Sequence, residues 1–169
     1  MPENEELNKR IEFDITIDKG TLYDFLVYHA YSTSTGLIGT CFGSLGILGF
    51  ISSNCENFLF LILGLVLIVY TPVSLKLQAS KTVQLNPVYK NPLHYVIDEN
   101  GITVSQGETT TTAGWDQCRK AVSTRLSILV YTGKKNASIF PRKQLGDRLT
   151  AVLAVMANYI EPSKMRVKY

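Results

Sequence analysis

Residues 58–75 read FLFLILGLVLIVYTPVSL, a run of eighteen residues without a charged side chain. This length lies at the lower end of what an α-helix needs to cross a bilayer. Pro72 is the one helix breaker, and it lies near the end of the run, where neighbouring groups can compensate for its missing N–H. We therefore expect a transmembrane helix over residues 58–75.

A second uncharged stretch precedes this run. Residues 36–53 read GLIGTCFGSLGILGFISS, and only residues 54–57 separate the two stretches. A buried helix pair of a soluble protein is the alternative, but soluble helices of this length normally carry a polar face, which both stretches lack. The polar or mixed residues 1–35 also argue against a signal peptide. The pattern predicts a two-helix transmembrane hairpin.

The orientation of the hairpin follows from the basic residues at its flanks, because short cytoplasmic segments carry an excess of Lys and Arg. The connecting residues 54–57 contain neither residue type. The outer flanks contain Lys9, Arg10 and Lys19 before the hairpin and Lys76, Lys81 and Lys90 after it. We expect a multi-pass protein of the cell membrane with two spans and both termini in the cytoplasm.

Glycines recur along the first predicted span at steps of three, four and three residues. They are Gly36, Gly39, Gly43 and Gly46. This spacing places them on one helical stripe, and small residues let two helix backbones approach closely in lipid. The stripe predicts packing against either the second span near Gly64 or the same helix of another subunit, which would give a homo-oligomer.

The flanking sequences predict a β-rich domain. Residues 11–18, IEFDITID, alternate between apolar and polar side chains, as a half-buried strand does. One strand is not stable alone, so it must pair with the short strands expected between residues 93 and 140. An amphipathic helix over residues 143–160 follows them.

The expected fold class is an α+β membrane protein, with the hairpin inserted into a pleckstrin-homology-like antiparallel β barrel that a C-terminal helix caps. Residues 1–35 supply the first strand, which joins the later β domain, and a juxtamembrane helix. Residues 36–75 form the hairpin, and residues 76–169 form the cytoplasmic β domain with its helix.

Several segments together resemble the YcxB-like family of bacterial membrane proteins over nearly the whole chain. They are IEFDITID, YDFLVYHAY, HYVIDENGITVSQG, the turn Gly114-Trp115-Asp116 and SILVYTGKKNASIFPRKQL. The step from Ile139 to Lys143, in which a strand ends at Pro141 before the final helix, fits the family pattern. The resemblance implies a pleckstrin-homology-like cytoplasmic domain and no established catalytic residues.

The sequence contains no recognisable enzyme motif, since GxSxG, HExxH, P-loop and dinucleotide fingerprints are all absent. Its three cysteines form no CxxC pair, which argues against a zinc site. We therefore expect a protein that is not an enzyme, with no catalytic, cofactor-binding or metal-binding residues and no cofactor.

The charge of the chain is uneven. Residues 1–75 carry eight acidic and three basic side chains, whereas residues 76–169 carry six acidic and fourteen basic ones. A basic segment after a membrane span suits an anionic leaflet, and without a nucleic-acid motif we expect no nucleic-acid partner. The candidate contacts to lipid or a protein partner are Lys134, Lys135, Arg142, Lys143 and Trp115. A solvated basic turn and a barrel-closing tryptophan are the alternatives.

The function expected from these features is a membrane-anchored, non-catalytic binding module that recognises a protein segment or anionic membrane lipid. An immunity-like or envelope-stress protein that protects against membrane-active peptides is the alternative. A transporter subunit ranks third, because neither predicted span contains an ionisable acidic or basic residue.

Overall fold

The computed structural model describes residues 10–133 and 136–167. The chain divides into two compact units. The hairpin unit comprises Leu26–Thr82, and the α+β unit comprises Met1–Phe25 together with Val83–Tyr169. The chain thus leaves the α+β unit before the hairpin and returns to it afterwards.

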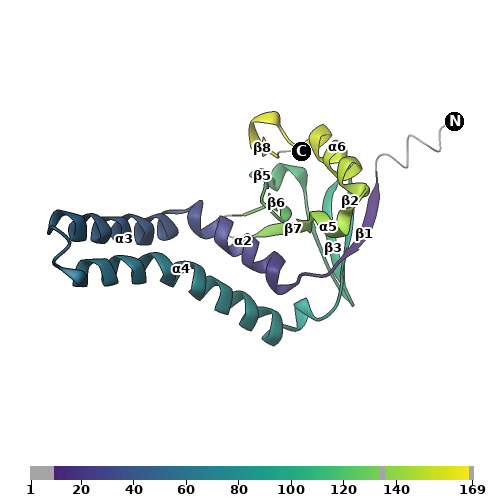
Figure 1. The fold of residues 1–169 in the computed structure, drawn as a ribbon. Coiled ribbons are helices and arrows are strands. Elements are labelled where there is room, and N and C mark those ends of the chain that lie inside the picture. The colour runs from purple at the N-terminus through teal and green to yellow at the C-terminus, as the bar shows by residue number, and fades with distance from the viewer. Residues whose placement is uncertain (1–9, 134–135, 168–169) are drawn as a thin grey trace. The chain divides into compact units, whose positions relative to one another are not determined.

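Three helices contribute to the hairpin unit. They are the second half of α2 (Lys19–Tyr31), α3 (Ser34–Ser52) and nearly all of α4 (Phe58–Leu85). α3 and α4 run side by side (Figure 1). Asn54 and Cys55 in the connection both have positive φ, 54° and 63°, which turns the chain sharply after α3. α4 continues ten residues beyond the predicted end at residue 75, so that its 28 residues extend over about 42 Å.

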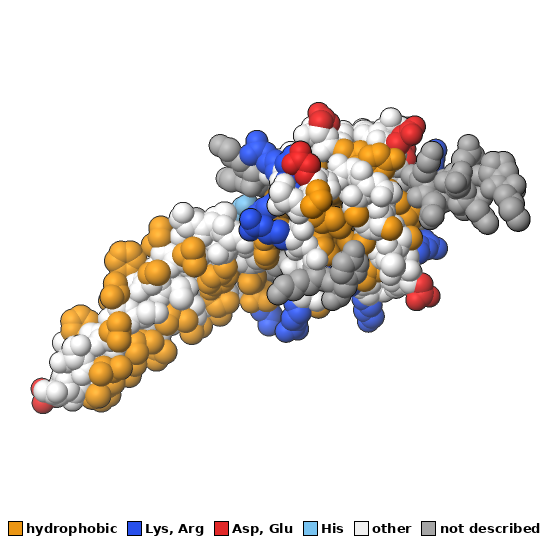
Figure 2. Space-filling model, turned by 90° about the horizontal axis from the view of Figure 1, so that it is seen from above, with side chains coloured by type: hydrophobic (Ala, Val, Ile, Leu, Met, Phe, Trp, Pro, Cys, Tyr) orange, Lys and Arg blue, Asp and Glu red, His pale blue; other side chains and the backbone are white. Residues whose placement is uncertain are grey.

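The surface of the hairpin unit is largely apolar. Figure 2 shows hydrophobic side chains spread along this helical unit. Phe42, Phe58 and Leu59 are 61%, 62% and 69% exposed. Among the described residues, α4 is the one helix that is long and apolar enough by itself to cross a membrane. A second candidate arises only if α2 and α3 are taken together as one bent span.

The first sheet of the α+β unit is antiparallel and joins strands from both sides of the hairpin insertion. Its order is β1 (Ile11–Ile15), β2 (Leu93–Asp98), β3 (Gly101–Gln106) and β4 (Thr109–Ala113). Phe13 of β1 lies opposite Tyr95 of β2. The turn between β2 and β3 depends on Gly101, whose φ of 138° strains other residue types and whose added Cβ would collide with the carbonyl of Ala113.

The second sheet has the order β7 (Ala137–Pro141), β6 (Ser127–Tyr131), β5 (Lys120–Ser123) and β8 (Met165–Arg166). β6 is buried along its whole length, as expected for a central strand between two partners. β8 pairs with β5 in the parallel direction. This short last strand lies beyond the predicted C-terminal helix and was not expected from the sequence.

The expected closed barrel is wrong, because the strands of the described residues form two separate sheets. No strand pairing joins β4 to β5 within this part of the chain. Gly114 and the 3₁₀ turn η2 (Trp115–Gln117) redirect the chain between them. β5 also has both edges occupied, by β6 and β8, so no edge is left for β4.

The predicted C-terminal helix is divided into α5 (Arg142–Leu145) and α6 (Arg148–Tyr159). Gly146 between them has a φ of 50°, which interrupts the helix. α5 contacts β7 and α6 contacts β2. The core contains an aromatic cluster in which the ring of Phe140 meets the rings of Phe13 and Tyr95 edge to face, at centroid distances of 5.9 and 5.0 Å.

Candidate functional site

The predicted basic contacts differ in their surroundings. Lys134 and Lys135 lie outside the described residues. Arg142 is half-buried, and its guanidinium donates a hydrogen bond to the Ser123 hydroxyl. Lys143 is exposed. Arg142 therefore contributes to the fold of the second sheet, whereas Lys143 presents its charge to solvent.

Trp115 does not close a barrel but stacks on Tyr159 at the end of α6. The two ring centroids are 5.4 Å apart and the ring planes differ by only 7°. The indole Nε1 donates a 2.8 Å hydrogen bond to the carbonyl of Asp98 at the end of β2. These contacts hold the ring in a defined orientation, half-buried at the surface of the α+β unit.

A small pocket of about 180 Å³ adjoins this aromatic pair. Its lining consists of Trp115, Asp116, Cys118, Tyr159, Ile160, Glu161 and Lys164. Burial raises the pKa of the Cys118 thiol, so the thiol is held in its protonated, less reactive form. The volume lies below the roughly 300–1,000 Å³ of typical small-molecule sites, so the pocket suits a single side chain better than a cofactor.

A polar junction fixes the turn between β5 and β6 to helix α2. Thr124 and Ser127 close the turn through hydrogen bonds of 2.8 Å (Thr124 N to Ser127 O) and 3.0 Å (Ser127 N to Thr124 Oγ1). The carboxylate of Asp24 on α2 accepts hydrogen bonds from the Thr124 hydroxyl and, at 3.3 Å, from the Leu126 N–H. No periodicity in the sequence pointed to Asp24, because its partners are a hundred residues away along the chain.

Basic side chains gather at this turn. Arg125 is exposed and Leu126 is 39% exposed at its tip. The backbone N–H of Arg142 donates a 2.9 Å hydrogen bond to the Leu126 carbonyl, which places the start of α5 beside the turn. We call Arg125, Leu126, Arg142 and Lys143 the basic turn. It unites two of the predicted contacts with two residues that sequence analysis missed.

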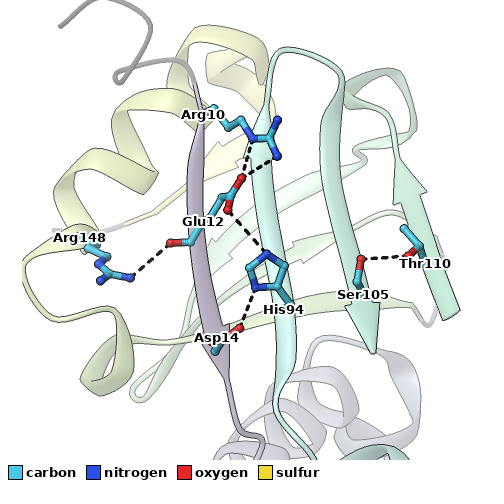
Figure 3. Close-up of polar contacts among 7 residues, drawn as sticks. All are labelled: Arg10, Glu12, Asp14, His94, Ser105, Thr110 and Arg148. Atoms are coloured by element: carbon cyan, nitrogen blue, oxygen red, sulfur yellow. Dashed lines mark hydrogen bonds and ion pairs between the residues drawn. The ribbon is translucent and has the colours of Figure 1, made fainter. Parts of the chain in front are cut away.

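A second polar cluster lies on the solvent-exposed face of the first sheet (Figure 3). Nδ1 of His94 lies 2.8 Å from Asp14 Oδ1, and its Nε2 lies 3.8 Å from Glu12 Oε2. Arg10 pairs with the same Glu12 carboxylate at 2.6 Å. These side chains are 45–69% exposed, so the cluster resembles an ordinary cross-strand ion-pair network more than a catalytic centre.

The two edge strands of the first sheet, β1 and β4, differ in the side chains that surround them. At β1, the Gln144 side chain bonds both the N–H and the C=O of Thr16, at 2.9 and 2.7 Å, and Arg148 donates to the Glu12 carbonyl at 3.3 Å. These side chains cover the backbone at this edge. β4, at the other edge, is formed mainly by exposed threonines.

Three of the four predicted packing glycines lie against α4. A Cβ added at Gly43 or Gly46 would come within 2.9 Å of the backbone of Gly64, and one added at Gly39 would come within 3.2 Å of Thr71 Oγ1. Gly36 instead faces the carbonyl of Ala30 at the break between α2 and α3. The close approach predicted near Gly64 is thus present within one chain.

No cluster of three or more His, Cys, Asp or Glu side chains suitable for a metal ion occurs in the described part of the chain. Cys41 and Cys55 are exposed and Cys118 is buried, and all three are free thiols.

A family model described as YcxB-like protein matches residues 97–153. No curated protein and no solved structure matches the chain. The matched segment runs from β2 into α6 and so lies wholly within the α+β unit. It includes the basic turn and Trp115, and it excludes the hairpin unit.

Proposed function

We propose that this chain, which is YcxB-like over residues 97–153, is a non-catalytic binding module that a two-helix hairpin anchors in a membrane. The observation that carries the proposal is the exposed apolar surface of α3 and α4. Large hydrophobic side chains such as Leu45, Leu48 and Leu63 are more than half exposed. In water this surface would far exceed the apolar patches that soluble monomers expose, whereas in lipid it is the expected exterior of a spanning pair.

The composition of the two stretches supports the same proposal. Residues 36–53 and 58–75 contain no Asp, Glu, Lys or Arg. α4 then continues with Lys76 and Lys81, both exposed, whose long side chains can reach the headgroup region. With no Lys or Arg between the helices, we propose that both termini and the α+β unit are cytoplasmic.

The binding role rests on the α+β unit. Its exposed clusters are the basic turn, the pocket beside Trp115 and the polar face around His94. None of these aligns a nucleophile with a base in the way acyl or phosphoryl transfer requires. Recognition of anionic lipid or of a protein segment therefore fits these surfaces better than catalysis.

Topology is the first test. Cys55 is exposed between the helices, so a variant with Cys41→Ser and Cys118→Ala leaves it as the one thiol. We expect alkaline carbonate to leave the chain in the membrane fraction and a membrane-impermeant thiol reagent to label Cys55 in intact cells. Labelling that needs lysis would refute the orientation, and release by carbonate would refute the membrane anchor itself.

A further inference from the structure

We propose that the basic turn is a second membrane contact, which binds the headgroups of anionic phospholipids in the bilayer that the hairpin enters. The inference rests on the proposed anchor and names the partner of the α+β unit. It depends on the chemistry of the turn, on its attachment to α2 and on the finding that neither Arg125 nor Lys143 forms a salt bridge within the described residues.

The chemistry of the turn combines positive charge with an exposed apolar side chain. Arg125 and Lys143 are exposed, and among the described residues neither takes part in a salt bridge. Leu126 follows Arg125 in the chain, and its carbonyl accepts the N–H of Arg142, the residue before Lys143. Cations that bind phosphate, together with a leucine that can enter the headgroup boundary, are the features of a peripheral membrane contact.

Acidic groups near the turn are already engaged. The Asp24 carboxylate accepts hydrogen bonds from the Thr124 hydroxyl and the Leu126 N–H. Asp18 accepts a 2.6 Å hydrogen bond from the Thr21 N–H, and this bond is the main reason why its pKa is lowered, with a smaller contribution from the charge of Lys143. These carboxylates therefore orient the turn and α2, and Arg125 forms no salt bridge among the residues described.

Attachment to α2 ties the turn to the segment of chain that leads into the hairpin. α2 is one continuous helix from Lys19 to Tyr31, and Asp24 holds the turn at the middle of this helix. The uncharged stretch of the first span begins at residue 36. The helix from Asp24 to Tyr31 rises about 10 Å at 1.5 Å per residue, and the residues from Tyr31 to 36 can add at most about 18 Å. The chain between Asp24, which holds the turn, and the start of the uncharged stretch therefore spans at most about 28 Å, so the turn can reach the bilayer that the hairpin enters.

The test measures the depth of position 126 in nanodiscs that hold the full-length chain. The native thiols are replaced (Cys41→Ser, Cys55→Ser, Cys118→Ala), and Leu126→Cys carries an environment-sensitive fluorophore. Quenching by nitroxide-labelled lipid is compared between phosphatidylcholine discs and mixed phosphatidylcholine–phosphatidylglycerol discs. We expect quenching in the anionic discs that weakens with added salt.

Charge variants test the cations directly. Arg125→Gln and Lys143→Gln should each lower the equilibrium constant for contact of the turn with the bilayer about fivefold, because each cation near the surface contributes about 1 kcal/mol. The double variant should lower it about 25-fold. Arg119→Gln is the matched control, because exposed Arg119 precedes β5 whereas Arg125 follows it. This control should leave the quenching unchanged.

A label at Phe42→Cys in α3 separates the two proposals. If position 42 is quenched and position 126 is not, the basic turn does not bind lipid, although the anchor stands. Equal quenching of position 126 in both disc types, or an equal effect of Arg119→Gln, would refute the requirement for anionic headgroups. If position 42 also escapes quenching, the anchor fails and the inference fails with it.

Discussion

The crossing of α3 and α4 gives a pair of substitutions that differ only in what a single methyl group would meet. A Cβ at Gly46 would lie 2.8 Å from the Cα of Gly64, 3.0 Å from its N and 3.0 Å from the carbonyl oxygen of Phe60. All three are backbone atoms, which no side-chain rotation can move. A Cβ at Gly49, one turn later, would meet the Phe60 ring at 3.4 Å, an ordinary contact.

The magnitude follows from the separation that Gly46→Ala forces. Restoring a normal carbon–carbon contact of about 3.5 Å requires the helices to part by about 0.7 Å, and such a gap removes a quarter to a half of each dispersion contact. With about 20 atom pairs at the crossing, each contributing about 0.1–0.2 kcal/mol, the loss is about 1 kcal/mol. Strain raises the total cost to about 1–3 kcal/mol.

Gly→Ala also improves helix propensity by up to about 1 kcal/mol, but it does so equally at both positions. We therefore expect Gly46→Ala to be less stable than Gly49→Ala by about 1–3 kcal/mol. The assay is reversible SDS titration of the purified chain in mixed micelles, followed by circular dichroism. Indistinguishable midpoints for the two variants would refute close packing of α3 on α4.

Gly43→Leu distinguishes the two partners of the glycine stripe, because Gly43 also lies against the backbone of Gly64. If the stripe packs within one chain, the variant should lower the unfolding midpoint of the hairpin and leave the molar mass from light scattering unchanged. If the variant instead lowers the molar mass and leaves the unfolding midpoint unchanged, the stripe packs against another subunit.

Three further predictions concern the α+β unit. The hydrogen bond from the Thr21 N–H lowers the pKa of Asp18, so the carboxylate stabilises the fold above its unfolded-state pKa of about 4, and this contribution is lost as the pH falls through the lower folded-state value. Asp18→Asn should therefore flatten the acid side of a plot of unfolding free energy against pH. An unchanged plot would contradict this role. Burial raises the pKa of Tyr95 to about 12, so the difference in phenolate absorbance between the native protein and Tyr95→Phe should titrate near that pH. The free energy of unfolding should also fall as the pH rises above about 10. Titration of this phenol near pH 10 in the folded protein would show that it is not buried. Gln144→Ala removes two hydrogen bonds to the backbone of Thr16. It should lower the free energy of unfolding in urea by about 1–2 kcal/mol and speed the hydrogen exchange of the Thr16 amide. Unchanged exchange would show that the side chain does not protect this edge.

Local patterns in the sequence were sufficient for the elements that local physics controls. The uncharged run of residues 58–75 predicted the apolar part of α4, because helix formation and hydropathy depend on near neighbours. The alternation in residues 11–18 predicted β1. The pairing of Phe13 with Tyr95 of β2 confirms that this strand joins the strands that follow the hairpin in the chain. The 3.6-residue periodicity identified the buried face of α6, including Val152, Leu153 and Met156.

Tertiary structure decided the features that depend on which distant groups compete for the same edge or partner. β8 occupies the free edge of β5 and so leaves two sheets in place of a barrel. Asp24 bonds to Thr124, and the Arg142 N–H bonds to the Leu126 carbonyl, so the basic turn combines the β5–β6 turn with the start of α5, which share no sequence pattern. The physical reason is that periodicity indicates only which face of an element is apolar. Strand partners and buried hydrogen bonds depend on residues about a hundred positions apart, which meet only in the packed chain.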